Sequence, residues 1–156
     1  MSDRLAALYP QHLAYVKARA DHALARGGHD LLLVAAGTQT YRFLDDTPNP
    51  YYPNPQFKWW LPLTQHPDCW IAYTPGRKPV LVYVQPADYW HKPPALPGGS
   101  WLGEFSLEVL RDADSARDLL ELDGMRIAFI GEWHERFADW GFAAANPAGL
   151  LNELHY

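Results

Sequence analysis

Apolar residues recur along the chain at two kinds of spacing, one typical of helices and one typical of strands. Between Leu5 and Arg26 they return every three to five residues, which predicts a long helix ending at Gly27-Gly28. Residues 30–37 form a continuous apolar run closed by glycine, as in a strand buried on both faces. Residues 40–44 alternate between polar and apolar, so we expect a second strand there.

The rest of the pattern predicts a hairpin, two more strands and further helices. The hairpin would join residues 70–73 to 80–84 through Pro75-Gly76. Strands are expected at 105–110 and 126–131, and helices from a cap at Asp114-Ser115 to about Leu122, at 132–140 and from Pro147 onward. This alternation predicts an α/β fold, a single domain over residues 1–156 with a mixed β-sheet flanked by helices.

One segment interrupts this regular pattern. The strand-like residues before it stop at two adjacent carboxylates, Asp45-Asp46, and residues 48–60 are then rich in proline and aromatic side chains. We expect neither a helix nor a central strand here, because proline lacks an N–H donor and restricts the residue before it. The aromatic content is too high for a disordered linker, so the pattern indicates an ordered surface loop that begins with an acid.

Composition excludes several classes of protein. The net charge of −5 and the scattered basic residues argue against a nucleic-acid binder. No apolar stretch is long enough for a membrane helix, and the first residues lack the pattern of a signal peptide. The single cysteine, Cys69, cannot form an internal disulfide and lies in a strand-like run, where a buried inert thiol is expected. These features favour a cytoplasmic protein.

Most catalytic and cofactor motifs are missing. None of the seven histidines has the spacing that places two metal ligands on one helix face, and Glu132-Trp133-His134-Glu135 comes nearest. Nucleotide-binding loops and the nucleophile elbow are absent as well. We therefore expect no metal ligand and no catalytic residue in this chain.

Two acidic segments stay as candidates. Neighbouring residues of a strand point to opposite faces, so Asp45 and Asp46 would act separately, one in a turn or cap and the other outward. The segment Asp88-Tyr89-Trp90-His91 has two interpretations that composition does not separate. It is either a small hydrophobic cluster under a loop or a wall of a pocket or subunit interface.

These segments also carry a resemblance. The chain resembles the N-terminal domain of bacterial Xaa-Pro dipeptidase (prolidase), in the subgroup of the creatinase/prolidase family that includes the organophosphorus acid anhydrolases. The matching residues run in order over the whole chain: Leu8-Tyr9, His12, Phe43-Leu44-Asp45-Asp46, Asn54-Pro55-Gln56-Phe57-Lys58, Cys69-Trp70, Lys78-Pro79, Pro86, Trp90-His91, Ile130-Gly131-Glu132, Asn146-Pro147 and Leu154-His155-Tyr156.

The resemblance implies a two-domain metallo-exopeptidase that hydrolyses dipeptides with a C-terminal proline. Its C-terminal "pita-bread" domain, absent from this chain, would carry two divalent metal ions, usually manganese, and a metal-bridging hydroxide would attack the peptide bond. This chain would be the non-catalytic, ribonuclease-H-like N-terminal domain, inactive alone.

The resemblance also implies a homodimer in which the proline-rich loop covers the partner's active site. Matched residue by residue, Asp46 would then line the pocket near the free ammonium group of the dipeptide, and Trp90 would be a neighbour of Asp46 in that pocket. The sequence departs from relatives at Pro50-Tyr51-Tyr52-Pro53, within that loop, and at Ala35-Ala36-Gly37, where relatives often have His-Ser-Gly. The first departure bears on substrate preference and the second on how the loop is braced.

Two other classes of function remain open. The chain could be a stand-alone module whose aromatic loops bind a small molecule or a protein edge. It could also be a self-contained hydrolase that pairs Asp46 with His91, although no third residue is spaced to orient that base.

Overall fold

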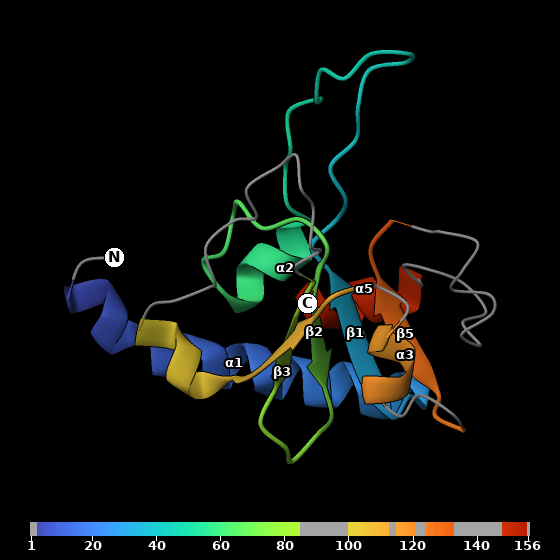
Figure 1. Ribbon diagram of the computed structural model, residues 1–156. Coiled ribbons are helices and arrows are strands. Elements are labelled where there is room, and N and C mark those ends of the chain that lie inside the picture. Colours follow the sequence, from blue (N-terminus) through green and yellow to red (C-terminus); the bar gives the residue numbers. More distant parts are fainter. Residues whose placement is uncertain (1–2, 85–99, 113–114, 121–123, 133–147, 156) are drawn as a thin grey trace.

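The computed structural model describes residues 3–84, 100–112, 115–120, 124–132 and 148–155 (Figure 1). They form a five-stranded sheet in the order β4-β3-β2-β1-β5, with helices on both faces. The strands are β1 (Leu31–Ala35), β2 (Cys69–Tyr73), β3 (Val80–Val84), β4 (Ser106–Leu110) and β5 (Ile127–Ile130). The helices are α1 (Asp3–Gly27), α2 (Pro55–Trp60), η1 (Ser100–Glu104), α3 (Ser115–Leu119) and α5 (Ala148–His155).

The sheet is mixed, as the sequence predicts. β1 is antiparallel to β2 but parallel to β5, and β3 is antiparallel to β2 but parallel to β4. All five residues of β1 are buried, because strands flank it on both edges and helices cover both faces. The continuous apolar run at residues 30–37 therefore supplies an inner strand of the sheet.

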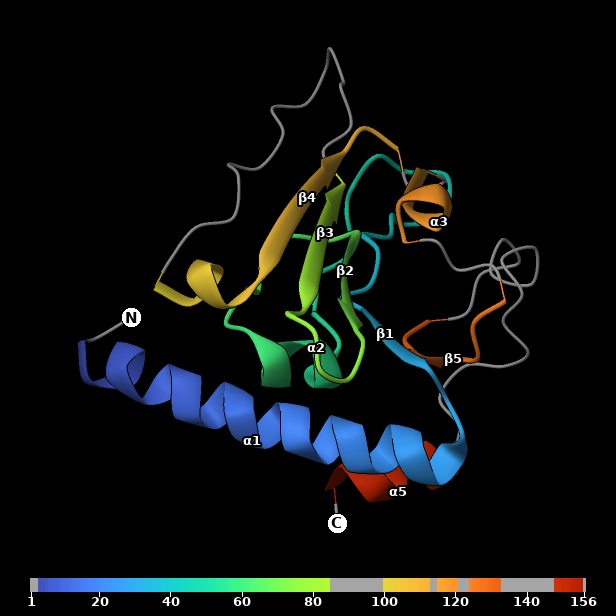
Figure 2. The ribbon, with the colours of Figure 1, turned by 90° about the horizontal axis from the view of Figure 1, so that it is seen from below.

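The larger core lies between the sheet and α1. The buried stripe of α1 contains Tyr9, Leu13, Val16, Ala20, Ala23 and Leu24. Figure 2 shows α1 crossing one face of the sheet with α5 beside it. A smaller core on the opposite face contains Trp70 and Phe129 and is covered by Ala116 of α3. Alternate side chains of the strands thus enter two separate cores.

Three expectations about local structure are wrong in part. Residues 40–44 do not form a strand: an isolated bridge joins Tyr41 to Pro48, and Leu44 has a φ of 56°. β1 already has a partner on each edge, so the chain leaves the sheet and turns back. Alternation by itself cannot supply a strand to pair with.

The proline-rich segment contains a helix, α2, which proline was expected to prevent. Pro55 lies at its start, where the missing N–H has no helical acceptor in any case. The Asn54 side chain caps the helix by accepting a hydrogen bond from the Gln56 N–H at 3.0 Å.

Helix α3 begins at Ser115 as expected, but its cap includes Asp112. The Asp112 carboxylate accepts from the Ser115 N–H and the Ser115 hydroxyl, both at 2.9 Å. The helix ends at Leu119, before the expected Leu122. Asp114, the expected irregular stretch 86–99 and most of the expected helix at 132–140 lie outside the described residues.

Candidate functional site

An arm, residues 38–53, leaves the end of β1 and returns to α2. It stands out from the body of the molecule beyond the end of the sheet (Figure 1). Its base is held by Asn49, whose N–H donates to the Thr40 carbonyl at 2.8 Å and whose side-chain amide donates to the Thr40 hydroxyl at 3.1 Å. The Gln39 amide in turn donates to the Asn49 carbonyl at 2.5 Å. The arm is therefore an ordered loop with its own hydrogen bonds.

The two carboxylates at the end of the arm have different environments. Asp45 accepts a hydrogen bond from the Thr47 N–H at 3.1 Å, which stabilises the turn. The Asp46 side chain is exposed and has no hydrogen-bond or ion-pair partner among the described residues. One acid serves the turn and the other is available to an external group.

Two large apolar side chains precede this carboxylate in the chain. Phe43 and Leu44 are each 91% exposed. Tyr52, on the returning segment of the arm, is 82% exposed. Side chains of this size lose favourable burial when left in water. An exposed acid among exposed apolar groups is the arrangement expected of a contact surface.

The second candidate is not among the described residues. Trp90, with the rest of the segment 88–91 and the His91 of the hydrolase hypothesis, lies outside the described residues. Within the described part of the chain, no three His, Cys, Asp or Glu side chains gather as metal ligands. Cys69 is buried, and burial raises the pKa of its thiol far above the ordinary range, so it is not a nucleophile.

Two histidines serve structural roles. A His12 ring nitrogen lies 2.7 Å from the Trp59 carbonyl, and this contact links α1 to the end of α2. His22 lies 3.0 Å from the Glu153 carboxylate, which also pairs with Arg26 at 2.9 Å and so ties α1 to α5. The sequence pattern did not reveal these partners.

A pocket that the sequence did not predict lies at the base of the arm. This basal pocket has a volume of about 570 Å³. Its lining residues come from the ends of β1 and β5 and from the junction of the arm with α2: Ala35, Ala36, Gly37, Tyr52, Pro53, Asn54, Pro55, Lys58, Gly131 and Glu132. The only sequence signal of this pocket was Ala35-Ala36-Gly37, two small residues before a glycine at the end of a buried apolar run.

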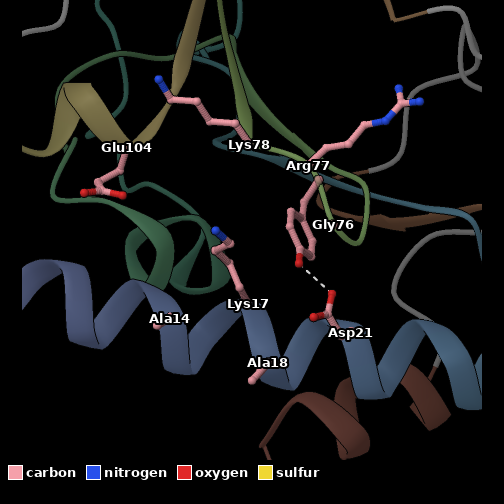
Figure 3. Close-up of a pocket in the computed structure, with 9 residues that line it drawn as sticks. Ala14, Lys17, Ala18, Asp21, Gly76, Arg77, Lys78 and Glu104 are labelled. Carbon is pink, nitrogen blue, oxygen red and sulfur yellow. Dashed lines mark hydrogen bonds between the residues drawn. The ribbon is translucent and has the colours of Figure 1, made fainter.

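A second pocket, here called the hairpin pocket, lies between α1, the β2–β3 turn and η1. It measures about 520 Å³ and is lined by Ala14, Lys17, Ala18, Asp21, Tyr73, Gly76, Arg77, Lys78 and Glu104. One wall is closed by the Tyr73 hydroxyl, which donates to the Asp21 carboxylate at 2.5 Å (Figure 3). Burial and this hydrogen bond raise the pKa of Tyr73.

No helix of the described residues is both long enough and apolar enough to cross a membrane.

Comparison with known proteins matches almost the whole chain to one family. The family model described as "Xaa-Pro dipeptidase, N-terminal domain" matches residues 7–156. An Xaa-Pro dipeptidase of Stenotrophomonas maltophilia (strain K279a) is 44% identical over 150 residues, which are 96% of this chain and 33% of that relative. One of Xanthomonas axonopodis pv. citri (strain 306) is 42% identical over 152 residues, 97% of this chain and 34% of the relative.

A third relative, an Xaa-Pro dipeptidase of Pseudoalteromonas atlantica (strain T6c / ATCC BAA-1087), is 41% identical over 153 residues, 98% of this chain and 34% of that relative. The chain therefore spans about a third of the length of the curated relatives it matches. The mixed sheet flanked by helices is consistent with the resemblance drawn from the sequence. The chain belongs to the Xaa-Pro dipeptidase N-terminal domain family.

Proposed function

We propose that this chain is the N-terminal domain of a metal-dependent Xaa-Pro dipeptidase and that its arm closes the active site of the partner subunit in a homodimer. The family match and the relatives named Xaa-Pro dipeptidase support the enzyme class. The observation that carries the role of this domain is the arm, with the exposed carboxylate of Asp46 and two apolar side chains each 91% exposed. A second surface would bury these side chains.

In this proposal Asp46 binds the free ammonium group of the dipeptide. A carboxylate facing an ammonium makes a charge-assisted hydrogen bond, which is stronger than a neutral one. A longer peptide has an amide in place of that ammonium and extends into the space that the arm closes. Asp46 would thus set the preference for dipeptides while the chemistry takes place in another domain.

The remaining parts of the enzyme are assigned by the same proposal. The two divalent metal ions, manganese in the usual case, would be held by the C-terminal catalytic domain. Trp90 is proposed as a neighbour of Asp46 in the partner's pocket. The buried single cysteine fits a cytoplasmic enzyme, and this domain by itself is expected to be inactive.

The role of Asp46 is tested in the intact enzyme. Asp46→Asn removes the charge with little change in shape, so we expect KM for Xaa-Pro dipeptides to rise at least about tenfold. N-acetylated dipeptides have no ammonium group and make no ion pair with Asp46, so the substitution should change their KM little. Discrimination against them should therefore fall. Asp45→Asn is the matched control, since an amide oxygen still accepts the Thr47 N–H. Unchanged KM and unchanged discrimination in Asp46→Asn would contradict the assignment.

Mixed dimers test whether the arm acts across the subunit interface. One subunit carries Asp46→Ala, and the other carries an inactivating substitution of a metal ligand in its second domain. The intact metal site then receives a normal Asp46 from its partner, so KM should return to the wild-type value. A KM that stays raised would show that the arm acts within its own subunit. Full binding of a small molecule without any second domain would instead favour the stand-alone binding module.

A further inference from the structure

The basal pocket is formed where two parallel strands end side by side. Val34 of β1 pairs with Ile130 of β5. After each strand the backbone turns away at a glycine of positive φ, Gly37 at 106° and Gly131 at 154°. The turns leave a space beyond the carboxyl ends of the strands. In sheets with parallel strands, such spaces are common sites for small ligands.

The walls of the pocket are mainly apolar, and the backbone groups that face one another are already paired. The Asn54 N–H donates to the Ala36 carbonyl at 2.9 Å, and the Asn54 amide donates to the Ala35 carbonyl at 3.1 Å. The Asn54 side-chain oxygen is occupied by the Gln56 N–H. Small side chains, prolines and Tyr52 form the rest of the wall, so a ligand would meet carbon over most of its surface.

Two opposite charges on this wall have no partner among the described residues. Lys58 of α2 and Glu132 after β5 both line the pocket, and neither side chain makes an ion pair or a hydrogen bond with another described residue. They lie on separate elements that flank the end of β1. The lining of the pocket therefore includes one cation and one anion among mainly apolar walls.

The hairpin pocket lacks this arrangement although its volume is similar. It is lined by three cations and two carboxylates, and Asp21 is already bound to Tyr73. Figure 3 shows Arg77 and Lys78 leaving the turn in different directions, away from Lys17. Its charges do not converge on one ligand, so it serves as a control rather than a candidate.

We propose that the basal pocket binds an apolar α-amino acid in its zwitterionic form. Lys58 pairs with the ligand's carboxylate, Glu132 pairs with its ammonium, and the side chain lies against Ala35, Pro53 and Tyr52. A volume of about 570 Å³ is within the range of small-molecule sites. The proposal concerns a site in this domain and does not depend on the dipeptidase activity or on Asp46.

The test uses the intact protein and three probes of nearly the same shape. L-leucine carries both charges, 4-methylpentanoate carries only the carboxylate, and 3-methylbutylamine carries only the ammonium. Binding is measured by isothermal titration calorimetry without any substrate turnover. Leucine should bind more tightly than either singly charged probe, because each charge-assisted contact contributes about a factor of ten in affinity.

Substitutions then assign the two contacts. Lys58→Met should weaken leucine and 4-methylpentanoate about tenfold and leave 3-methylbutylamine unchanged, while Glu132→Gln should weaken leucine and the amine and spare the acid. Lys17→Met and Glu104→Gln, from the hairpin pocket, should change nothing. Absence of leucine binding, or binding that neither Lys58→Met nor Glu132→Gln alters, would overturn the proposal. Dipeptidase kinetics are recorded separately, so failure of either proposal leaves the other to its own measurement.

Discussion

Gly131 shows how a single residue shapes both the core and the basal pocket. It follows β5 with a φ of 154°, a conformation that side-chain-bearing residues rarely adopt. A Cβ at this position would lie 2.7 Å from the Ala35 Cβ and 3.2 Å from the Phe129 Cζ. The close approach of β5 to the end of β1 thus requires a residue without a side chain.

We expect Gly131→Ala to lower the free energy of unfolding by about 2 kcal/mol or more, through backbone strain and the clash with Ala35. Urea titration followed by circular dichroism would measure this loss. Gly149→Ala is the matched control, because nothing lies within 4 Å of its added Cβ and α5 is helical there. That variant should be neutral or more stable by up to about 1 kcal/mol. Equal stability of the two variants would contradict the packing argument.

At the scale of elements, α2 joins the arm to the sheet through one residue. Asn54 caps α2 with its side-chain oxygen and holds the end of β1 with its amide and its N–H. Packing then fixes the position of α2, because its residues Phe57 and Trp60 are buried in the larger core. The helix is short, so its stability depends on this cap and these contacts rather than on helix propensity.

Asn54→Ala should therefore cost about 2 kcal/mol, the sum of a lost N-cap and a lost hydrogen bond to the Ala35 carbonyl. Asn54→Asp keeps an oxygen for the cap but replaces the amide donor with a second oxygen that faces the Ala35 carbonyl, so it should be destabilising as well. Thermal unfolding of the three proteins would measure both losses. An unchanged stability of Asn54→Ala would show that neither the cap nor the hydrogen bond to Ala35 contributes to the fold.

Local sequence patterns predict some elements of this fold correctly and others wrongly. The helix at residues 5–26 and the hairpin formed by β2 and β3 were predicted correctly, because their periodicity and their turn are local properties. The strand expected at 40–44 was wrong, because a strand requires an edge to pair with and β1 offers none. α2 was missed because proline was treated as a breaker, although its position at the start of a helix is favourable.

Over the whole molecule, the larger core contains several phenol groups and the only thiol. Tyr9, Tyr73, Tyr83 and Cys69 are buried there. Burial raises the pKa of each, since it disfavours the charged form; nearby Glu104 adds to the effect at Tyr9, and Asp21 adds to it at Tyr73. The folded state therefore holds these protons at pH values where the unfolded chain releases them.

The sign of the pH dependence follows from this difference. Between the unfolded pKa of about 10 for tyrosine and the higher folded pKa, the unfolded state binds fewer protons, so stability falls as pH rises. We expect the free energy of unfolding to begin to fall above about pH 8.5, where Cys69 ionises in the unfolded chain, and to decline steeply above about pH 10, where the tyrosines follow. Urea titrations across this range would measure the slope, and Tyr73→Phe should reduce it. A stability that stays flat to pH 11 would contradict the role of these buried groups.

The sequence by itself determined the helical stripe of α1, the buried strands, the mixed α/β class and the membership of the family. These features depend on residues close together in the chain or on matches spread along it in order. Only the tertiary structure decided the sheet order, the exposed position of Asp46 on a projecting arm, and the basal pocket. That pocket joins Ala35, Lys58 and Glu132, which are far apart in sequence. Their meeting depends on strand pairing and register, which arise from long-range packing that no local pattern encodes.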